Sequence, residues 1–158
     1  MKSILMAIFL TACGGAQQNT DNLGEAIRSY NDGVRWGRYT VAAAKVPAKE
    51  RAAFIEDMDE RAEKVKITDY EIVDVNAKST REARVRIKIG WYNSDEGTVH
   101  ETHAAQMWER QGKLWFMVEE SRVRGKEMPG LPEPVEPVKD PVPDPQRPKD
   151  SRTSRRGD

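Results

Sequence analysis

Cysteine is nearly absent from this sequence, and so is any imbalance of charge. Cys13 is the only cysteine among 158 residues, which excludes an internal disulfide and a zinc site built from several cysteines. Lysine plus arginine number 26, as do aspartate plus glutamate, so no net positive field attracts nucleic acid. Charged residues make up 33% of the chain and hydrophobic residues 37%, which suits one small domain. We therefore expect a single domain with no nucleic-acid partner.

The sequence also lacks an apolar run long enough to cross a membrane, which takes about 20 residues. A short apolar run over residues 4–10 follows Lys2 and precedes the small residues Thr11 and Ala12. A positive charge, a short apolar stretch and small residues in this order are typical of a secretory signal. We predict that residues 1–12 are a signal peptide that is removed.

The residues that end this signal, Leu10-Thr11-Ala12-Cys13, resemble the lipobox of bacterial lipoproteins. The lipobox has an aliphatic residue, two small residues and the cysteine. The resemblance implies that a peptidase cuts before Cys13, that the thiol carries a diacylglycerol, and that a fatty acid such as palmitate acylates the new amino group. Two or three acyl chains hold a protein firmly on a membrane, whereas one chain does so only reversibly. Membrane attachment through lipid on Cys13 is therefore the first partner that the sequence predicts.

The residues after the cysteine indicate where the protein resides. Gly14 stands where the retention signal of inner-membrane lipoproteins has aspartate, which implies the outer membrane, on its periplasmic or surface face. Residues 13–22 are small and polar, and we expect them to form a flexible tether. The alternative is an ordinary signal peptide that contains a cysteine, or a different start codon, and either would leave Cys13 without lipid.

Proline is scarce before residue 129 and abundant after it. Eight of the nine prolines lie between Pro129 and Pro148, and no helix or central strand tolerates such spacing. We predict that residues 126–158 form a disordered tail, extended as polyproline II, with a basic end. One interpretation is that the tail extends toward the cell wall or a partner. The other, which the composition favours, is a tail without a role.

Between tether and tail, residues 23–125 have the periodicity of one folded domain. Apolar residues at steps of three and four predict a helix from residue 23 that ends or bends between Asn31-Asp32-Gly33 and Trp36-Gly37. A short helical piece follows over residues 39–46. A third helix is expected over residues 47–64, where proline suits the first turn.

Past Val65 the period falls to two, which predicts antiparallel strands. The phase slips near Ile72 in the first strand, which indicates a bulge. In the second strand, odd-numbered residues from Val85 to Trp91 are expected to face the core, and the basic residues between them to face water. The four predicted strands span residues 66–75, 83–92, 98–110 and 113–120.

Helices followed by a curved antiparallel sheet resemble the NTF2-like, or cystatin-like, α+β fold. The resemblance covers roughly residues 23–120 and implies a conical pocket between the sheet and the helices. It also implies a candidate homodimer through the sheet, as in many relatives. The stretches that carry it are similar to small bacterial lipoproteins of unassigned role: residues 30–37 (YNDGVRWG), residues 66–73 (KITDYEIV), and Trp108-Glu109-Arg110 before the Gly112 turn into Leu114-Trp115-Phe116.

The third strand indicates which side chains face that pocket. Its odd-numbered residues include Glu101, His103 and Glu109, whereas its even-numbered residues carry no carboxylate, ammonium or guanidinium group up to Trp108. The even face is therefore expected to point inward. The alternative is that these side chains serve packing, which four tryptophans in a small domain favour. The candidate site for a small ligand comprises Tyr30, Trp36, Trp91, His100, Thr102, Gln106 and Trp108.

The two histidines do not form an obvious metal site. On a strand, His100 and His103 point to opposite faces, so they could not easily share one ion. We expect neither a metal nor a cofactor.

No pattern in the sequence indicates catalysis. Enzymes of the ketosteroid-isomerase-like group, which share this fold, use a carboxylate base with an acidic or phenolic partner. Tyr30 supplies a phenol, but no Asp or Glu is expected to point inward. A nucleophile elbow, a phosphate loop and a dinucleotide fingerprint are all missing. We therefore expect a non-enzymatic accessory lipoprotein that binds another envelope protein. The alternative is a carrier or sensor of a small apolar ligand in the pocket.

Overall fold

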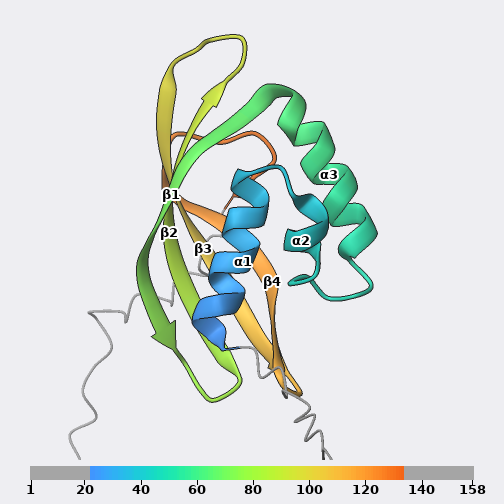
Figure 1. The fold of residues 1–158 in the computed structure, drawn as a ribbon. Coiled ribbons are helices and arrows are strands. Elements are labelled where there is room, and N and C mark those ends of the chain that lie inside the picture. The colour runs from blue at the N-terminus through green and yellow to red at the C-terminus, as the bar shows by residue number, and fades with distance from the viewer. Residues whose placement is uncertain (1–21, 134–158) are drawn as a thin grey trace, which may run out of the picture.

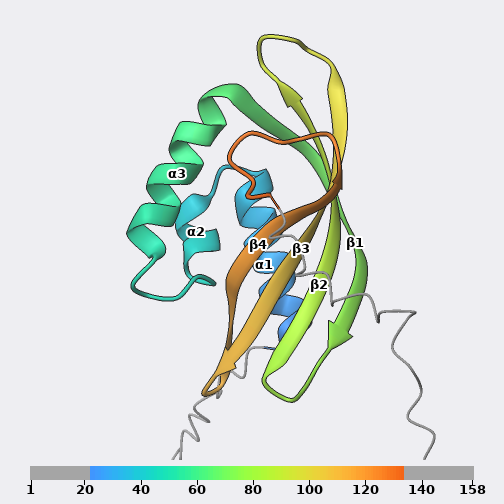
Figure 2. The same cartoon turned by 180° about the vertical axis from the view of Figure 1, so that it is seen from behind.

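The computed structural model describes residues 22–133, in which three helices lie on one side of a curved, four-stranded antiparallel sheet (Figure 1 and Figure 2). The sheet order is β1-β2-β3-β4, so each strand pairs with its neighbour in the sequence. This confirms the predicted α+β fold. The predicted signal peptide, Cys13, the tether up to residue 21 and the tail from residue 134 lie outside the described residues. The elements are α1 (Leu23–Arg35), α2 (Tyr39–Ala43), α3 (Arg51–Lys64), β1 (Val65–Ala77), β2 (Glu82–Asn93), β3 (Val99–Gln111) and β4 (Leu114–Gly125).

The first helix, α1, has the start and the end that its sequence predicts. The Asn22 side chain caps it by accepting a hydrogen bond from the Glu25 N–H at 2.8 Å. The helix ends just before Gly37. The φ of this residue is 66°, in the left-handed region that glycine adopts readily. Within the helix, Gly33 permits close packing against α2, since a Cβ there would lie 2.8 Å from the backbone nitrogen of Ala42. The residues that α1 buries are Ala26, Ile27, Tyr30, Asn31 and Gly33.

Polar contacts also join α1 to the edge strand β1. The Tyr70 hydroxyl donates to Asp32 Oδ1 at 3.0 Å, and Arg35 Nη1 lies 3.2 Å from Asp69 Oδ1. Burial, together with the bond to Asp32, raises the pKa of Tyr70 to about 12. The Tyr70 phenol therefore keeps its proton at neutral pH and can donate its hydrogen bond to Asp32.

The second and third helices are shorter than the sequence predicts. The α2 helix ends at Ala43, and α3 starts at Arg51 and not at Pro47. The intervening turn is closed by the Glu50 N–H, which donates to the Pro47 carbonyl at 2.9 Å. Arg51 Nε donates to the Val46 carbonyl at 3.0 Å and holds the chain at the entrance to α3. The predicted start of the third helix is therefore wrong, because Pro47 begins the turn.

The inner face of the sheet follows the predicted alternation. β2 buries its odd-numbered residues Val85, Ile87, Ile89 and Trp91 against the helices. β1 has register shifts between Ile67 and Asp69 and between Ile72 and Asp74. The second shift confirms the bulge predicted near Ile72.

The outer face of the sheet carries ion pairs. Lys88 Nζ lies 2.6 Å from Glu71 Oε2, and Arg86 Nη2 lies 3.3 Å from Asp74 Oδ2. The basic residues of β2 thus face away from the helices, as predicted. Such a charged surface differs from the apolar centre of most homodimer interfaces. The homodimer through the sheet stays a prediction.

The folded domain continues past β4 into a C-terminal segment, residues 126–133. Met128 and Leu131 of this segment are buried in the core. The Lys126 N–H donates to a β3 carbonyl at 3.0 Å, and the Pro132 carbonyl accepts from a β4 N–H at 2.7 Å. The predicted start of a disordered tail at Lys126 is therefore wrong. Proline excludes regular helices and central strands, but it does not prevent an irregular segment from packing.

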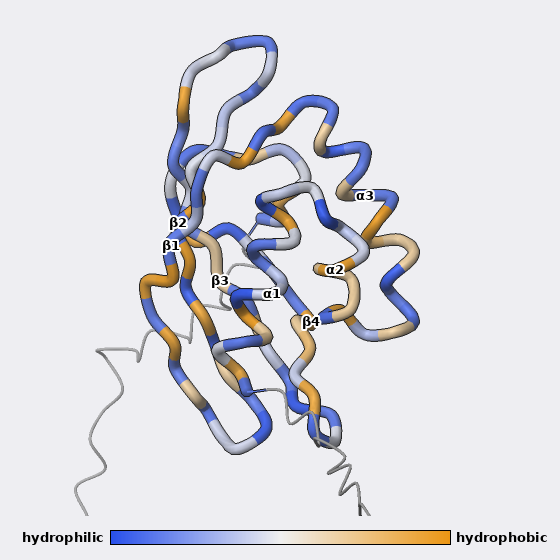
Figure 3. Tube along the Cα trace, in the orientation of Figure 1, coloured by the Kyte–Doolittle hydropathy of each residue, from blue (hydrophilic) through white to orange (hydrophobic). Residues whose placement is uncertain are grey.

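The distribution of apolar residues leaves α3 less tightly packed than α1. Figure 3 shows apolar residues recurring along the strands and α1, whereas α3 is largely hydrophilic. Met58 is the buried residue of α3, so this helix stands off from the sheet. Within residues 22–133, no helix is long and apolar enough to span a bilayer.

Candidate ligand-binding site

Most residues of the predicted pocket meet on the inner face of the sheet. Thr102, Gln106 and Trp108 of β3 are fully buried, and Trp91 of β2 is buried beside them. Tyr30 of α1 meets Trp108 edge to face, with ring centroids 5.9 Å apart. The even-numbered residues of β3 thus point inward, as the charge pattern predicts.

These inward side chains hydrogen-bond to one another and to the backbone. Trp91 Nε1 donates to Thr102 Oγ1 at 2.9 Å, and the Thr102 hydroxyl donates to the Lys126 carbonyl. Gln106 Nε2 donates to Asn31 Oδ1 at 2.9 Å, and Asn31 Nδ2 donates back to Gln106 Oε1 at 3.3 Å. These polar atoms find their hydrogen-bond partners within the protein. This set of inward side chains therefore fits the packing interpretation better than a ligand site.

Trp36 lies outside this interior, so its predicted place in the pocket is wrong. Its side chain is 63% exposed, and the Arg35 guanidinium lies 4.8 Å from the ring centroid. The reason is that α1 ends at Arg35, and the chain turns away at Gly37.

The histidines occupy two different environments. His100 is half-buried beside Trp91, with ring centroids 4.9 Å apart, and its Nε2 lies 3.4 Å from Glu96 Oε2. His103 Nε2 lies 3.1 Å from Glu101 Oε1, on the opposite side of β3. In the part of the chain that the structure describes, no three His, Cys, Asp or Glu side chains are placed to hold a metal ion.

A cavity of about 460 Å³ lies between α3, β4 and the C-terminal segment, and we call it the α3–β4 cavity. It exists because α3 stands off from the sheet. Six charged side chains belong to its lining: Arg61 and the acidic residues Glu50, Asp57, Glu119, Glu120 and Glu133. The apolar part of its wall includes Tyr30, Val46, Phe54, Met58 and Met117.

The sequence analysis missed Glu120, and it did not place Arg61 in the pocket either. A register shift in β4 lets Met117 pair with Trp108 and Glu120 pair with Gln106, so both β4 residues face inward. The Glu120 carboxylate accepts from the Gln106 amide at 2.8 Å and from the Tyr30 hydroxyl at 3.3 Å. The expectation that no carboxylate points inward is therefore wrong.

Burial controls the charge states around this carboxylate. Burial, followed by the neighbouring charge of Glu120, raises the pKa of Tyr30 well above its ordinary value. Tyr30 is thus a neutral donor to Glu120. Burial also lowers the pKa of Arg61, while the charge of Glu120 opposes that shift. The buried Tyr30 phenol is therefore bonded to Glu120 and influenced by the charge of Arg61.

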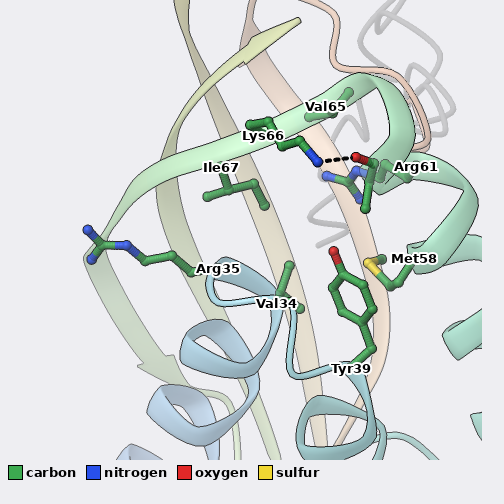
Figure 4. A pocket seen from close by; sticks show the side chains of 10 residues that line it. Val34, Arg35, Tyr39, Met58, Arg61, Val65, Lys66 and Ile67 are labelled. Atoms are coloured by element: carbon green, nitrogen blue, oxygen red, sulfur yellow. Dashed lines mark hydrogen bonds between the residues drawn. The ribbon is translucent and has the colours of Figure 1, made fainter. Parts of the chain in front are cut away.

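Arg61 faces more than one hollow. With Met58 it also lines a smaller cavity of about 210 Å³ between the end of α1, α3 and the start of β1. Figure 4 shows the Tyr39 hydroxyl and the Met58 sulfur near Arg61, whereas Arg35 points away from them. Arg61 Nη2 lies 3.5 Å from Met128 Sδ, which is a weak acceptor. The guanidinium therefore has donors that a ligand oxygen can use.

The arrangement suits a small molecule with an apolar body and a polar end. Phe54, Met58 and Met117 provide apolar contact, and Arg61 provides N–H donors.

Comparison with known proteins gives the fold and no closer assignment. No family model matches the chain, and no curated protein matches it. A SEC-C motif containing protein from Rhodopseudomonas palustris has a TM-score of 0.55 at 11% identity, over 63% of this chain and 77% of that one. A ketosteroid isomerase-like protein from Erwinia carotovora atroseptica has a TM-score of 0.53 at 16% identity, over 68% of this chain and 98% of that one.

A third solved structure is a domain of unknown function with a cystatin-like fold from Nostoc punctiforme. Its TM-score is 0.52 at 14% identity, over 66% of this chain and 78% of that one. At such identities the likeness concerns the fold alone. The chain therefore has the NTF2-like, or cystatin-like, α+β fold, on which many unrelated functions are built.

Proposed function

We propose that this chain is a lipid-anchored lipoprotein of the cell envelope whose domain binds a small, largely apolar ligand without transforming it. The observation that carries the proposal is the α3–β4 cavity. Its volume of about 460 Å³ falls within the range of small-molecule sites, about 300–1,000 Å³. Its apolar side chains supply the contact surface that such sites usually have, and six charged side chains share its lining.

The bonding of Tyr30 and Glu120 supports a non-catalytic role. An isomerase of this fold directs a carboxylate and a phenol at its substrate. Here the Tyr30 hydroxyl donates to Glu120 at 3.3 Å, and the other carboxylate oxygen accepts from Gln106 at 2.8 Å. A base must reach the proton that it removes, and this carboxylate is held by groups of its own protein.

The proposal of a lipid anchor is supported by the lipobox-like residues before Cys13 and by the short tether that follows. Residues 13–22 reach at most about 35 Å when fully extended, so the domain would stay near the membrane that holds the lipid. A ligand-binding domain so placed suits a carrier or sensor in the envelope. The outer membrane is the proposed location, because Gly14 replaces the aspartate that retains lipoproteins at the inner membrane.

Two neighbouring alanines of α3 test the cavity. Both are exposed, but Ala53 lines the cavity, whereas Ala52 does not. We expect Ala53→Phe to weaken binding of the apolar probe anilinonaphthalene sulfonate about tenfold, equivalent to about 1.4 kcal/mol, because the added ring occupies the cavity. Fluorescence titration measures the affinity, and Ala52→Phe should bind as the wild type does. Equal affinity in both variants, or no saturable binding to the wild type, would refute the proposal.

The edge of β1 favours a second candidate function, docking of another envelope protein. Val73 and Val75 are exposed on this strand, and within residues 22–133 its backbone pairs with β2 alone. An extended segment of a partner could add a strand there. A photoreactive amino acid at Val73 should then crosslink one protein of defined mass in intact envelopes. The same group at Arg84, on the outer face, should not, and background labelling at both positions would count against docking.

A further inference from the structure

A second site lies at the other end of the sheet from the C-terminal segment. The β1–β2 and β3–β4 turns enclose a hollow of about 540 Å³. The Arg110 N–H donates to the Arg81 carbonyl at 2.7 Å, so the two turns are held together. We call this hollow the turn cleft, and its lining residues are Thr80, Arg81, Arg110, Gln111 and Gly112.

The side chains that line the turn cleft are donors, and none is acidic. Arg81 and Arg110 contribute guanidinium groups, Thr80 contributes a hydroxyl and Gln111 contributes an amide. Gly112 adds a backbone N–H without a side chain above it, since a Cβ there would meet nothing within 4 Å. Convergent donors of this kind suit an anion with several oxygens.

One of these donors has no acceptor. Arg110 Nε is buried and lacks a hydrogen-bond partner among residues 22–133. Buried donors are nearly always paired, so an unpaired one needs an explanation, and an acceptor that enters when the cleft is occupied would provide it.

The carboxylates nearest in sequence, Glu82 and Glu109, are on the other face of the sheet. Glu82 of β2 pairs with Glu109 of β3, next to the buried pair Ala83 and Trp108. Because successive side chains of a strand alternate, the two glutamates face outward, and Arg110 falls on the inner face. These two glutamates therefore do not place a negative charge on the inner face beside Arg110.

We propose that the turn cleft binds a phosphate group, either of a lipid headgroup or of a free phosphate ester. Guanidinium forks bind phosphate through paired N–H donors, and the hydroxyl and the backbone N–H offer donors for its further oxygens. The first turn of α1 lies at the same end of the domain (Figure 1), and the proposed anchor precedes it by a short tether. This placement brings the cleft close to headgroups if the proposed anchor is correct.

The test of the site uses the full chain with Cys13→Ser, isotope-labelled for amide NMR in neutral detergent. This chain carries no lipid, so failure of the anchor and failure of the cleft are separate results. Inorganic phosphate, added against chloride at constant ionic strength, should shift the Thr80 and Gly112 amides saturably. The absence of a saturable shift would overturn the proposal.

Matched arginine variants locate the binding. Arg81→Gln and Arg110→Gln should each weaken phosphate binding at least about tenfold, because each removes charged donors. Arg84→Gln removes the same charge from the outer face of β2 and should bind as the parent does. Arg81 is exposed, so its variant remains informative even if the Arg110 variant fails to fold. An equal loss in Arg84→Gln would overturn the assignment to the cleft.

Vesicles distinguish the two sources of phosphate. Flotation compares phosphatidylcholine vesicles with vesicles that also contain phosphatidylglycerol, using the same Cys13→Ser chain. Enhanced binding to phosphatidylglycerol that Arg81→Gln abolishes supports the headgroup. Binding of inorganic phosphate without that enhancement supports a free phosphate compound. Enhancement that survives in both Arg81→Gln and Arg110→Gln counts against the cleft.

Discussion

Replacing Cys13 with serine is expected to abolish lipid attachment completely. The proposed diacylglycerol is joined through sulfur, and the lipoprotein peptidase acts on the lipidated cysteine. Without the thiol, the chain should keep its first twelve residues and remain a precursor. Metabolic labelling with a fatty-acid probe measures the attachment, and the mass of the purified chain measures the cleavage.

A conservative change in the same motif provides the control for lipidation. Thr11→Ser keeps a small residue beside the cleavage point and should be labelled as the wild type is. Residues 22–133 do not include Cys13, so the unfolding of the domain should be the same in all three proteins. Equal labelling of wild type and Cys13→Ser would show that Cys13 carries no lipid and would remove the anchor from the proposed function.

Replacing Trp108 with alanine is expected to cost about 3–5 kcal/mol of folding free energy. The side chain is 0% exposed, and its ring meets Tyr30 edge to face. Its Nε1 also donates to Gln106 Oε1 at 3.3 Å. A loss of this size is a large part of the stability of a typical domain, about 5–15 kcal/mol. Urea unfolding followed by circular dichroism measures it.

Trp36 offers a matched control in the same domain. It is 63% exposed, so Trp36→Ala should change the free energy of unfolding by only about 0.5 kcal/mol. The contrast between the two tryptophans checks the inner packing of β3 against α1. Similar losses in both variants would contradict the described core.

The strands could be predicted because their signal is local. From Ala83 to Ile89 of β2, apolar and basic residues alternate without interruption, and period two fixes which face is buried. In β3, the charge pattern alone placed Thr102, Gln106 and Trp108 inward. These predictions required no knowledge of how distant parts of the chain pack.

The inward orientation of Glu120 could not be predicted from the sequence in the same way. Alternation from Trp115 through Met117 predicts that Glu119 points inward and Glu120 outward. The register shift opposite Met107 and Trp108 reverses that phase. A bulge of this kind depends on pairing between two strands, so the sequence of β4 by itself does not reveal it.

The predicted boundary between the domain and the tail was wrong for a related reason. The prolines that follow predict an unstructured tail, yet Met128 and Leu131 are part of the core. Two apolar residues three apart, just ahead of a polar and proline-rich run, were the signal available. Their burial depends on the gap that α3 leaves, which is a property of the folded domain.

The most direct test of ligand binding in the α3–β4 cavity is native mass spectrometry of the chain purified in mild detergent from the cells that make it. The wild type and Ala52→Phe should carry the same additional small mass, which denaturation releases. Ala53→Phe should carry much less of it, because its ring occupies part of the cavity. A wild-type spectrum without any releasable mass, or the same mass at equal occupancy on Ala53→Phe, would contradict the proposed ligand-binding role.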